Sequence, residues 1–205
     1  MAHRLRIGVF GGAFDPPHNA HLALVRAALS QLALDVLHVC PTGQAWHKAR
    51  ALSPAADRLA MTRLAFAGLP GVVVDDRELR RSGPTFTIDT LNELRAIWPQ
   101  AQLHLIVGSD QARTLPTWHR WREILEIATI FVAVREETTL GMPDFSIENG
   151  FPGVAAGRLQ PLHLPALDIS ATLIRQRVAD GLGIGHLVPE GVARYIEHHH
   201  LYLAS

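Results

Sequence analysis

The sequence predicts an α/β fold, a doubly wound parallel sheet with helices on both faces. Short apolar runs alternate along the chain with longer segments of helical periodicity, which is typical of parallel strands joined by crossover helices. The composition is that of a globular protein, since 48% of the 205 residues are hydrophobic and 19% are charged. The length favours one domain, which we expect over residues 1–205 with a helical closing part at about 165–205.

Strands are expected where short, strongly apolar runs end at turn residues. These runs are Leu5–Phe10, Asp35–Cys40, Gly71–Asp75, Leu103–Val107, Thr129–Val134 and Leu159–Leu164. From Arg135 to Leu159, Gly and Pro are frequent and no period is visible, so a loop is expected there.

Helices are expected where apolar residues recur at helical spacing. They are Asn19–Leu34, a helix that opens at Ser53-Pro54, Thr87–Trp98, Gln111–Leu115, Trp118–Ile127, Ser170–Asp180 and Pro189–His198. Ser53 is expected to cap its helix with Pro54 at the first helical position. Ligands of such folds bind at the carboxyl ends of the strands, so the residues that follow strands are the first candidates for a site.

Charge and cysteine content exclude several classes of protein. The chain has 19 Lys and Arg against 19 Asp and Glu, which argues against binding to nucleic acid. The single cysteine, Cys40, excludes an internal disulfide and is expected to be a small buried hydrophobe. No apolar run is long enough for a membrane helix or a signal peptide, so we predict a soluble cytoplasmic protein without membrane contact.

Two polar clusters are interpreted as solvated surface. Asp75-Asp76 with Arg80-Arg81 are expected to form a solvated loop face, and His198–His200 to be exposed at the end of a helix.

The most informative segment runs from Gly11 to Leu22, between the first strand and the first helix. Glycines let a ligand approach the backbone, and the start of a helix offers free N–H groups to a phosphate. His18 and His21 are three residues apart and share one helix face, so both imidazoles could bind a phosphoryl group. Spacing alone leaves two other interpretations open: surface residues, or a zinc pair with Asp15. The dinucleotide fingerprint and the P-loop are both absent.

This segment, Gly-Gly-x-Phe-Asp-Pro-x-His-x-x-His, resembles the entry motif of the nucleotidyltransferase superfamily with a His-x-Gly-His signature. Within that superfamily it is most similar to the nicotinate-nucleotide adenylyltransferases. The resemblance implies a Rossmann-like fold and a nucleotidyltransferase domain. Ala20 stands where the family usually has Gly.

Further segments extend the resemblance over nearly the whole chain. They are His47-Lys48, the Thr85–Leu91 segment, Gly108-Ser109-Asp110, Trp118, Ser170-Ala171-Thr172 with Arg175, and the closing stretch from His186 to Tyr202. Ala171 replaces a usual Ser, and His186 a usual Tyr. The closing stretch is interpreted as packing.

The resemblance implies a role for each matched residue. Catalytic roles fall to His18, His21, Lys48 and Arg175. ATP contacts fall to Gly11, Gly12, Ala13, Phe14, Asp110, Ser170 and Thr172. Nicotinate-nucleotide contacts fall to Thr85, Phe86, Thr87 and Trp118.

Structural interpretations stand beside these roles. Thr87 and Asp89 are good residues for a helix start, so simple capping of that helix is an alternative role for them, and Ser170 can cap its helix. Two Trp residues three apart on one helix are more often core than ligand platform, and Trp121 is interpreted as core while Trp118 is expected to stack on the pyridine ring.

The implied activity is adenylyl transfer from ATP to nicotinate mononucleotide in NAD biosynthesis, with Mg²⁺ accompanying ATP and no resident metal site. A homo-oligomer is possible. The alternatives are nicotinamide mononucleotide or pantetheine phosphate as acceptor, or a nucleotide-binding regulator without turnover.

Overall fold

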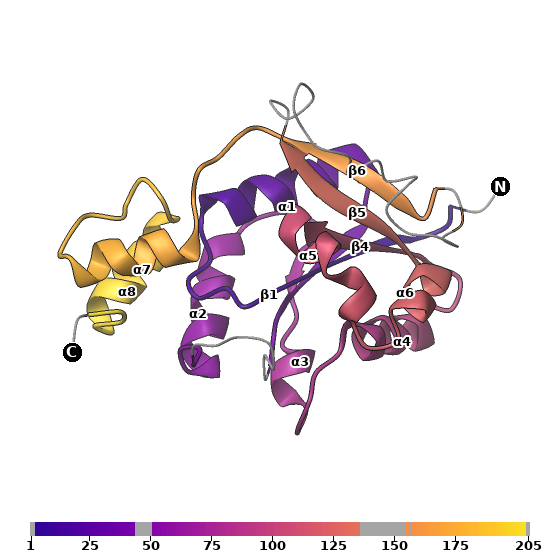
Figure 1. The fold of residues 1–205 in the computed structure, drawn as a ribbon, viewed down its shortest axis with the longest axis horizontal. Coiled ribbons are helices and arrows are strands. Elements are labelled where there is room, and N and C mark those ends of the chain that lie inside the picture. Colours follow the sequence, from indigo (N-terminus) through magenta and orange to yellow (C-terminus); the bar gives the residue numbers. More distant parts are fainter. Residues whose placement is uncertain (1–2, 44–50, 136–154, 156, 204–205) are drawn as a thin grey trace. The chain divides into compact units, whose positions relative to one another are not determined.

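The computed structural model describes residues 3–43, 51–135, 155 and 157–203 (Figure 1). It contains a six-stranded sheet with the order β3-β2-β1-β4-β5-β6. Consecutive strands run outward from β1 in one direction and from β4 in the other, so the order reverses between these two strands. This is the doubly wound, Rossmann-like topology, and the predicted fold class is confirmed.

All six predicted strands are present within a residue or two of their predicted ends. They are β1 Arg6–Gly12, β2 Val36–Pro41, β3 Val72–Val74, β4 Gln102–Gly108, β5 Ala128–Arg135 and β6 Leu159–Leu164. The helices are α1 Asn19–Leu32, α2 Ala55–Phe66, α3 Arg77–Arg80, α4 Thr87–Ile97, α5 Ser109–Arg113, the short 3₁₀ helix η1 Leu115–Thr117, α6 Trp121–Ile127, α7 Ala171–Ala179 and α8 Glu190–His198.

The chain divides into two compact units, each made of three separate segments. The first unit comprises residues 1–11, 24–38 and 86–166, and the second comprises residues 12–23, 39–85 and 167–205. Each unit therefore depends on contacts between residues far apart in the sequence.

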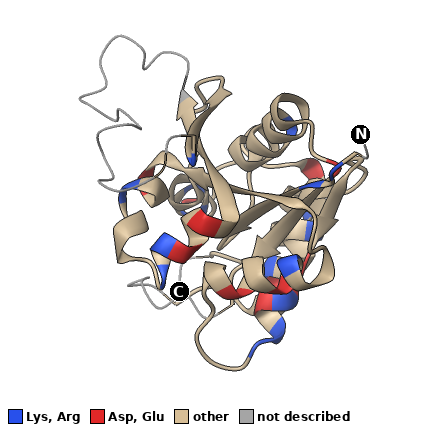
Figure 2. Cartoon of the chain, turned by 90° about the vertical axis from the view of Figure 1, so that its right-hand side faces the viewer, with Lys and Arg blue, Asp and Glu red and all other residues tan. Residues whose placement is uncertain are grey.

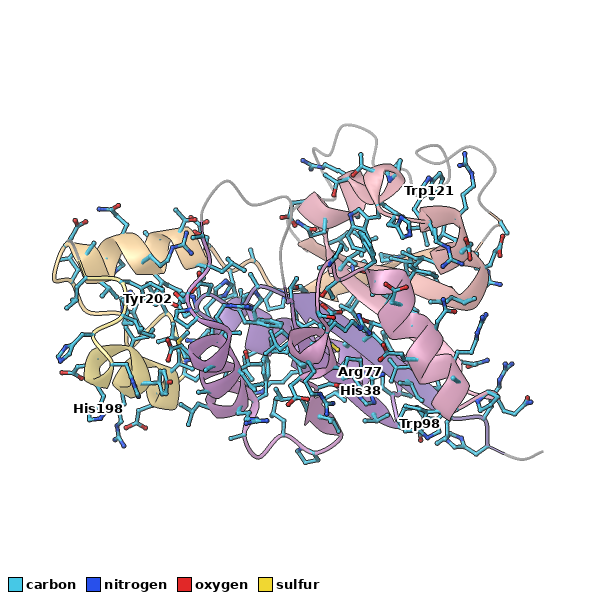
Figure 3. All side chains as sticks on the ribbon, turned by 90° about the horizontal axis from the view of Figure 1, so that it is seen from below. His38, Arg77, Trp98, Trp121, His198 and Tyr202 are labelled. Carbon is cyan, nitrogen blue, oxygen red and sulfur yellow. The ribbon has the colours of Figure 1, made fainter. Side chains whose placement is uncertain are left out.

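Parallel strand pairs form the core of the first unit. Strand β4 lies between β1 and β5, with Phe10 opposite Ile106 and Ile106 opposite Phe131. Leu103–Val107 are all buried, as expected for a central parallel strand covered on both faces. Two aromatic contacts in the first unit involve a histidine: His104 packs against Phe131, and His38 packs against Trp98. Figure 3 labels His38 and Trp98.

Helices α2 and α8 pack against each other in the second unit. The buried residues of α2 recur at helical spacing, and those of α8 are Val192 and Ile196. The Tyr195 hydroxyl of α8 donates a hydrogen bond to Asp57 of α2 at 2.9 Å. The prediction that the closing helix packs is confirmed.

Three local predictions are wrong. Ser53 does not cap α2: Pro54 occupies the cap position, and no side chain bonds the first amides. Thr87 and Asp89 stand in the first turn of α4, as expected, but neither caps it, because the cap position is extended Phe86 and no side chain caps the helix. Trp118 lies between η1 and α6 and is extended, so it does not share a helix with Trp121.

The predicted solvated loop face is also wrong in part. Asp75 is buried, and its carboxylate accepts from Arg77 at 2.7 Å. Arg77 begins the short helix α3, which the sequence did not predict. The same carboxylate accepts from the Arg77 backbone N–H, so a local turn holds the pair. Asp76 and Arg80 do lie near solvent, as predicted.

The predicted loop between Arg135 and Leu159 falls mainly on residues 136–154, which lie outside the described residues. Cys40 is buried, as predicted, and burial raises the pKa of its thiol. His198–His200 are exposed, as predicted. Figure 2 shows acidic and basic residues interspersed along the helices. In the described part of the chain, no helix is both long and apolar enough to span a membrane.

Candidate functional site: the loop after β1 and its partners

The loop after β1 is shaped by Phe14. Its φ of 48° is in the left-handed region, which non-glycine residues rarely adopt. Burial holds it there: the ring is 1% exposed and packs edge-on against Phe66 and His21. A Cβ at Gly12 would lie 2.9 Å from this ring, which explains the glycine. The Gly12 carbonyl accepts from the Thr42 N–H at 2.8 Å, so this loop is fixed to the end of β2.

His18 and His21 lie face to face. Their ring centroids are 3.7 Å apart, and the His18 backbone N–H donates to His21 Nδ1 at 3.2 Å. Because Nδ1 of His21 accepts, neutral His21 carries its proton on Nε2. His18 is buried, and burial lowers its pKa to about 4, so it is neutral at pH 7. The pair can therefore donate hydrogen bonds to an anion, and His18 does so without a charge.

The start of α1 differs from the prediction of free amides. The Asn19 backbone N–H donates to the Leu187 carbonyl at 2.9 Å, and the Asn19 side chain donates to the His186 carbonyl. The His21 N–H donates to the His18 carbonyl. These contacts join α1 to the segment before α8, so the backbone N–H groups of Asn19 and His21 are engaged within the protein.

Arg175 joins the loop after β1 to helix α7. Its Nη1 donates to the Asp15 carbonyl at 2.8 Å, and its Nη2 donates to Thr172 Oγ1 at 3.1 Å. Ser170 caps α7 by accepting from the Leu173 N–H, which confirms the structural interpretation of that serine. The two phosphate-binding segments predicted from the sequence therefore meet within the second unit.

Asp15 connects several segments of the chain, whereas the sequence suggested it only as a candidate zinc ligand. Its side chain is 3% exposed, and it accepts from the Ser53 N–H at 3.2 Å and from the Tyr202 hydroxyl at 2.7 Å. With the bond from Arg175 to its carbonyl, Asp15 connects three distant segments to one loop. A buried carboxylate is costly unless paired, and these contacts supply the pairing.

Arg58 is a second residue that the sequence analysis missed. It is 3% exposed, and its guanidinium donates to the carbonyls of Ser53, Ala13 and Thr42. It also interacts with the Asp15 charge. A sequence signal existed: Arg58 shares the buried stripe of α2, whose members are Arg58, Met61, Thr62, Ala65 and Phe66.

The end of β4 carries Asp110 in the first unit. A Cβ at Gly108 would lie 2.7 Å from the Asp110 carboxylate, so glycine permits this side chain to fold back towards the strand. Asp110 itself is exposed and available to a ligand. Because Phe10 pairs with Ile106 in parallel register, Gly11 and Gly108 lie near the carboxyl ends of the neighbouring strands β1 and β4, at one end of the sheet. This end, between β1 and β4, is where the strand order reverses.

The first unit also carries a group of aromatic side chains. The rings of Phe86 and His119 lie 4.3 Å apart, and Trp118 donates its indole N–H to Thr114 Oγ1 at 3.3 Å. Trp118 is half-buried. Trp121 is also half-buried, with the Arg122 guanidinium over its ring, so its interpretation as core is wrong.

The zinc interpretation of the histidine pair finds no support in the described residues. They contain no group of three or more His, Cys, Asp or Glu side chains arranged to hold a metal ion. Asp15, the candidate third ligand, is engaged by Ser53 and Tyr202.

Comparison with known proteins agrees with this geometry. The cytidylyltransferase-like family matches residues 9–177. The chain belongs to this family. A relative from Albidiferax ferrireducens, described as a probable nicotinate-nucleotide adenylyltransferase, is 58% identical over 96% of this chain and 98% of its own. A Dehalococcoides mccartyi relative with the same description is 42% identical over 97% of each chain.

A solved structure has the same fold. The Plasmodium falciparum nicotinic acid mononucleotide adenylyltransferase, complexed with NaAD, superposes with a TM-score of 0.77 at 21% identity over 98% of each chain. The resemblance read from the motif after β1 is therefore confirmed at the level of the family.

In this cytidylyltransferase-like protein, the second unit brings together Gly12, Ala13, Phe14, His18, His21, Thr172 and Arg175, with Ser170 and Thr85 on the same unit. The first unit carries Gly11, Phe86, Thr87, Asp110 and Trp118. His47 and Lys48 lie outside the described residues.

Proposed function

We propose that this protein transfers the adenylyl group of ATP to nicotinate mononucleotide, releasing pyrophosphate and forming nicotinate adenine dinucleotide in NAD biosynthesis. The observation that carries the proposal is the paired imidazoles of His18 and His21 in a member of this family. The two relatives that match 96% and 97% of the chain are both described as probable nicotinate-nucleotide adenylyltransferases.

The reaction needs no nucleophile from the protein. A phosphate oxygen of the mononucleotide attacks the α-phosphorus of ATP, a new P–O bond forms, and the bond to the bridging oxygen breaks as pyrophosphate leaves. Catalysis then consists of positioning and of stabilising the negative charge that spreads over the phosphates. His18 and His21 donate to the α-phosphate, and Lys48 and Arg175 bind the outer phosphates.

The remaining assignments follow the same scheme. Gly11, Gly12, Ala13 and Phe14 form the backbone wall beside the nucleotide, Asp110 accepts from a ribose, and Thr172 and the helix start at Ser170 contact phosphate. Thr85, Phe86 and Thr87 form the carboxylate site, and Trp118 stacks on the pyridine. Mg²⁺ would accompany ATP without a resident site on the chain, and it would offset negative charge on the phosphates.

Acceptor choice tests this proposal. A carboxylate only accepts hydrogen bonds, whereas an amide presents its own N–H groups to the donors near Thr87. Mismatched buried polar groups cost about 1–3 kcal/mol. We therefore expect nicotinate mononucleotide to be used at least about tenfold better than nicotinamide mononucleotide.

The measurement is pyrophosphate release with ATP and each of three acceptors, the two mononucleotides and pantetheine phosphate. Equal efficiency with both mononucleotides would indicate a dual-specificity enzyme. No release with any acceptor would indicate a nucleotide-binding regulator. The cytoplasmic location and a homo-oligomeric state stay predictions.

A further inference from the structure

The last aromatic residue of the described chain reaches the loop after β1. Tyr202 follows α8 in a turn, where His200 and Tyr202 both have positive φ. Its hydroxyl lies 2.7 Å from Asp15 Oδ1 and 4.0 Å from Met61 Sδ (Figure 3 labels Tyr202). Burial and the neighbouring carboxylate raise the pKa of this phenol, so it remains a hydrogen-bond donor at any physiological pH.

Asp15 also contacts, through its own backbone, the residues that we propose bind phosphate. Its carbonyl holds Arg175, and its backbone leads after two prolines to His18. A shift of the Asp15 backbone, which its carboxylate anchors through Tyr202, would therefore move both residues. Small displacements of positioning groups have large effects in sites of this kind.

We propose that Tyr202 is a positioning residue, whose hydroxyl holds the Asp15 carboxylate and thereby sets Arg175 and His18 for binding the phosphates of ATP. The inference rests on the proposed function for the identity of the nucleotide. It assigns a task to the closing stretch beyond the packing that the sequence suggested.

The chain contains a matched control. The Tyr195 hydroxyl also donates to an aspartate, Asp57, at 2.9 Å, and Tyr195 likewise belongs to the closing stretch. Asp57 lies on α2 and outside the loop after β1. Tyr195→Phe and Tyr202→Phe therefore remove the same kind of bond, and only the second removes it from the loop.

The test uses the full chain and measures ATP binding by calorimetry, steady-state kinetics and thermal melting for both variants. For Tyr202→Phe we expect the Kd of ATP to rise about tenfold, the size expected for a lost hydrogen bond to a charged group. The KM for nicotinate mononucleotide should stay within about twofold of the wild-type value. A residue with a purely structural role would instead affect both substrates alike. Tyr195→Phe should leave the Kd of ATP within about twofold of the wild type.

A double-mutant cycle tests whether Tyr202 affects ATP binding through Asp15. In an Asp15→Asn background, Tyr202→Phe should weaken ATP binding much less than it does in the wild type, because the two residues act through one contact. Equal ATP affinity in wild type and Tyr202→Phe, or equal losses in the two tyrosine variants, would overturn the inference.

A failure of the proposed function can be distinguished from a failure of the inference about Tyr202. A wild-type chain that binds ATP and releases no pyrophosphate with nicotinate mononucleotide would overturn the function, and the Kd comparison would still decide the role of Tyr202. A wild-type chain that does not bind ATP would overturn both.

Discussion

The imidazoles of His18 and His21 have unequal environments although they stack on each other. His18 is 7% exposed, and its buried Nδ1 has no hydrogen-bond partner among the described residues. His21 is half-buried, and a backbone amide fixes its ring. A neutral donor beside a fixed donor suits a site where charge develops on phosphate oxygens, because neither must reorganise during the reaction.

Substitution of either histidine should lower turnover more than it lowers ATP affinity. Loss of one preorganised donor costs ~10²–10³ in kcat in comparable sites. His18→Ala and His21→Ala should each show a loss of this size. His18→Asn should retain more activity than His18→Ala, because a neutral donor is kept.

The measurements are kcat, the KM for ATP and a melting curve for each variant. A folded variant with normal kcat would remove that histidine from the mechanism. A kcat/KM profile governed by a His18 titration near pH 6.5 would contradict the effect of burial, which lowers the pKa of His18 to about 4.

Helix α2 contributes more than a packed face. Through Arg58 it binds three backbone carbonyls, on the loop after β1, at the end of β2 and just before its own first turn. Ala13 and Thr42 are therefore held by one planar guanidinium, a geometry that lysine cannot reproduce. The helix thus fixes the loop in place from one side while α7 holds it through Arg175.

Arg58→Met should destabilise the protein strongly. It leaves buried carbonyls without a donor and the Asp15 carboxylate without its positive neighbour, and breaking such buried pairs costs about 3–5 kcal/mol. Arg63→Met on the same helix is the control. Arg63 is exposed, and its Nη2 lies 3.7 Å from Asp76 Oδ2. Loss of the Arg63 side chain should therefore change the free energy of unfolding by less than about 1 kcal/mol.

Urea unfolding of both variants measures these effects. Similar free energies of unfolding for Arg58→Met and the wild type would contradict the role assigned to this side chain.

Across the whole molecule, buried histidines make stability depend on pH. Burial lowers the pKa of His18 and of His104 to about 4 from 6.5, and the two residues belong to different units. The unfolded chain therefore binds more protons than the folded chain between pH 6.5 and 4. Stability is fully present above pH 6.5 and is lost as the pH falls through this window.

Between pH 7 and pH 5, each of these histidines should lower the free energy of unfolding by about 2 kcal/mol. Urea unfolding at pH 5, 6 and 7 measures the total. His104→Phe should make the free energy of unfolding depend less on pH. His104 is 6% exposed, and neither of its ring nitrogens has a hydrogen-bond partner among the described residues. A stability that is unchanged from pH 7 to pH 5 would show that both imidazoles protonate freely in the folded state.

The sequence by itself determined the strands, their alternation with helices and the segment that carries the histidines. Buried parallel strands are mainly apolar, so a run such as Leu103–Val107, which is apolar except for His104, predicts a strand without knowledge of its neighbours. The motif from Gly11 to His21 is equally local, because glycine, Phe14 and the two imidazoles shape one loop and one helix start.

The tertiary structure decided how that loop is held. Its contacts with Arg175 and Tyr202 join residues 160 and 187 positions apart, and the Arg58 contact crosses 45 positions. Likewise, the Leu187 carbonyl takes the Asn19 amide that helix geometry alone would leave free. A hydrogen bond of this kind depends on where the fold brings a donor and an acceptor, and no periodicity or local propensity along the chain encodes that meeting.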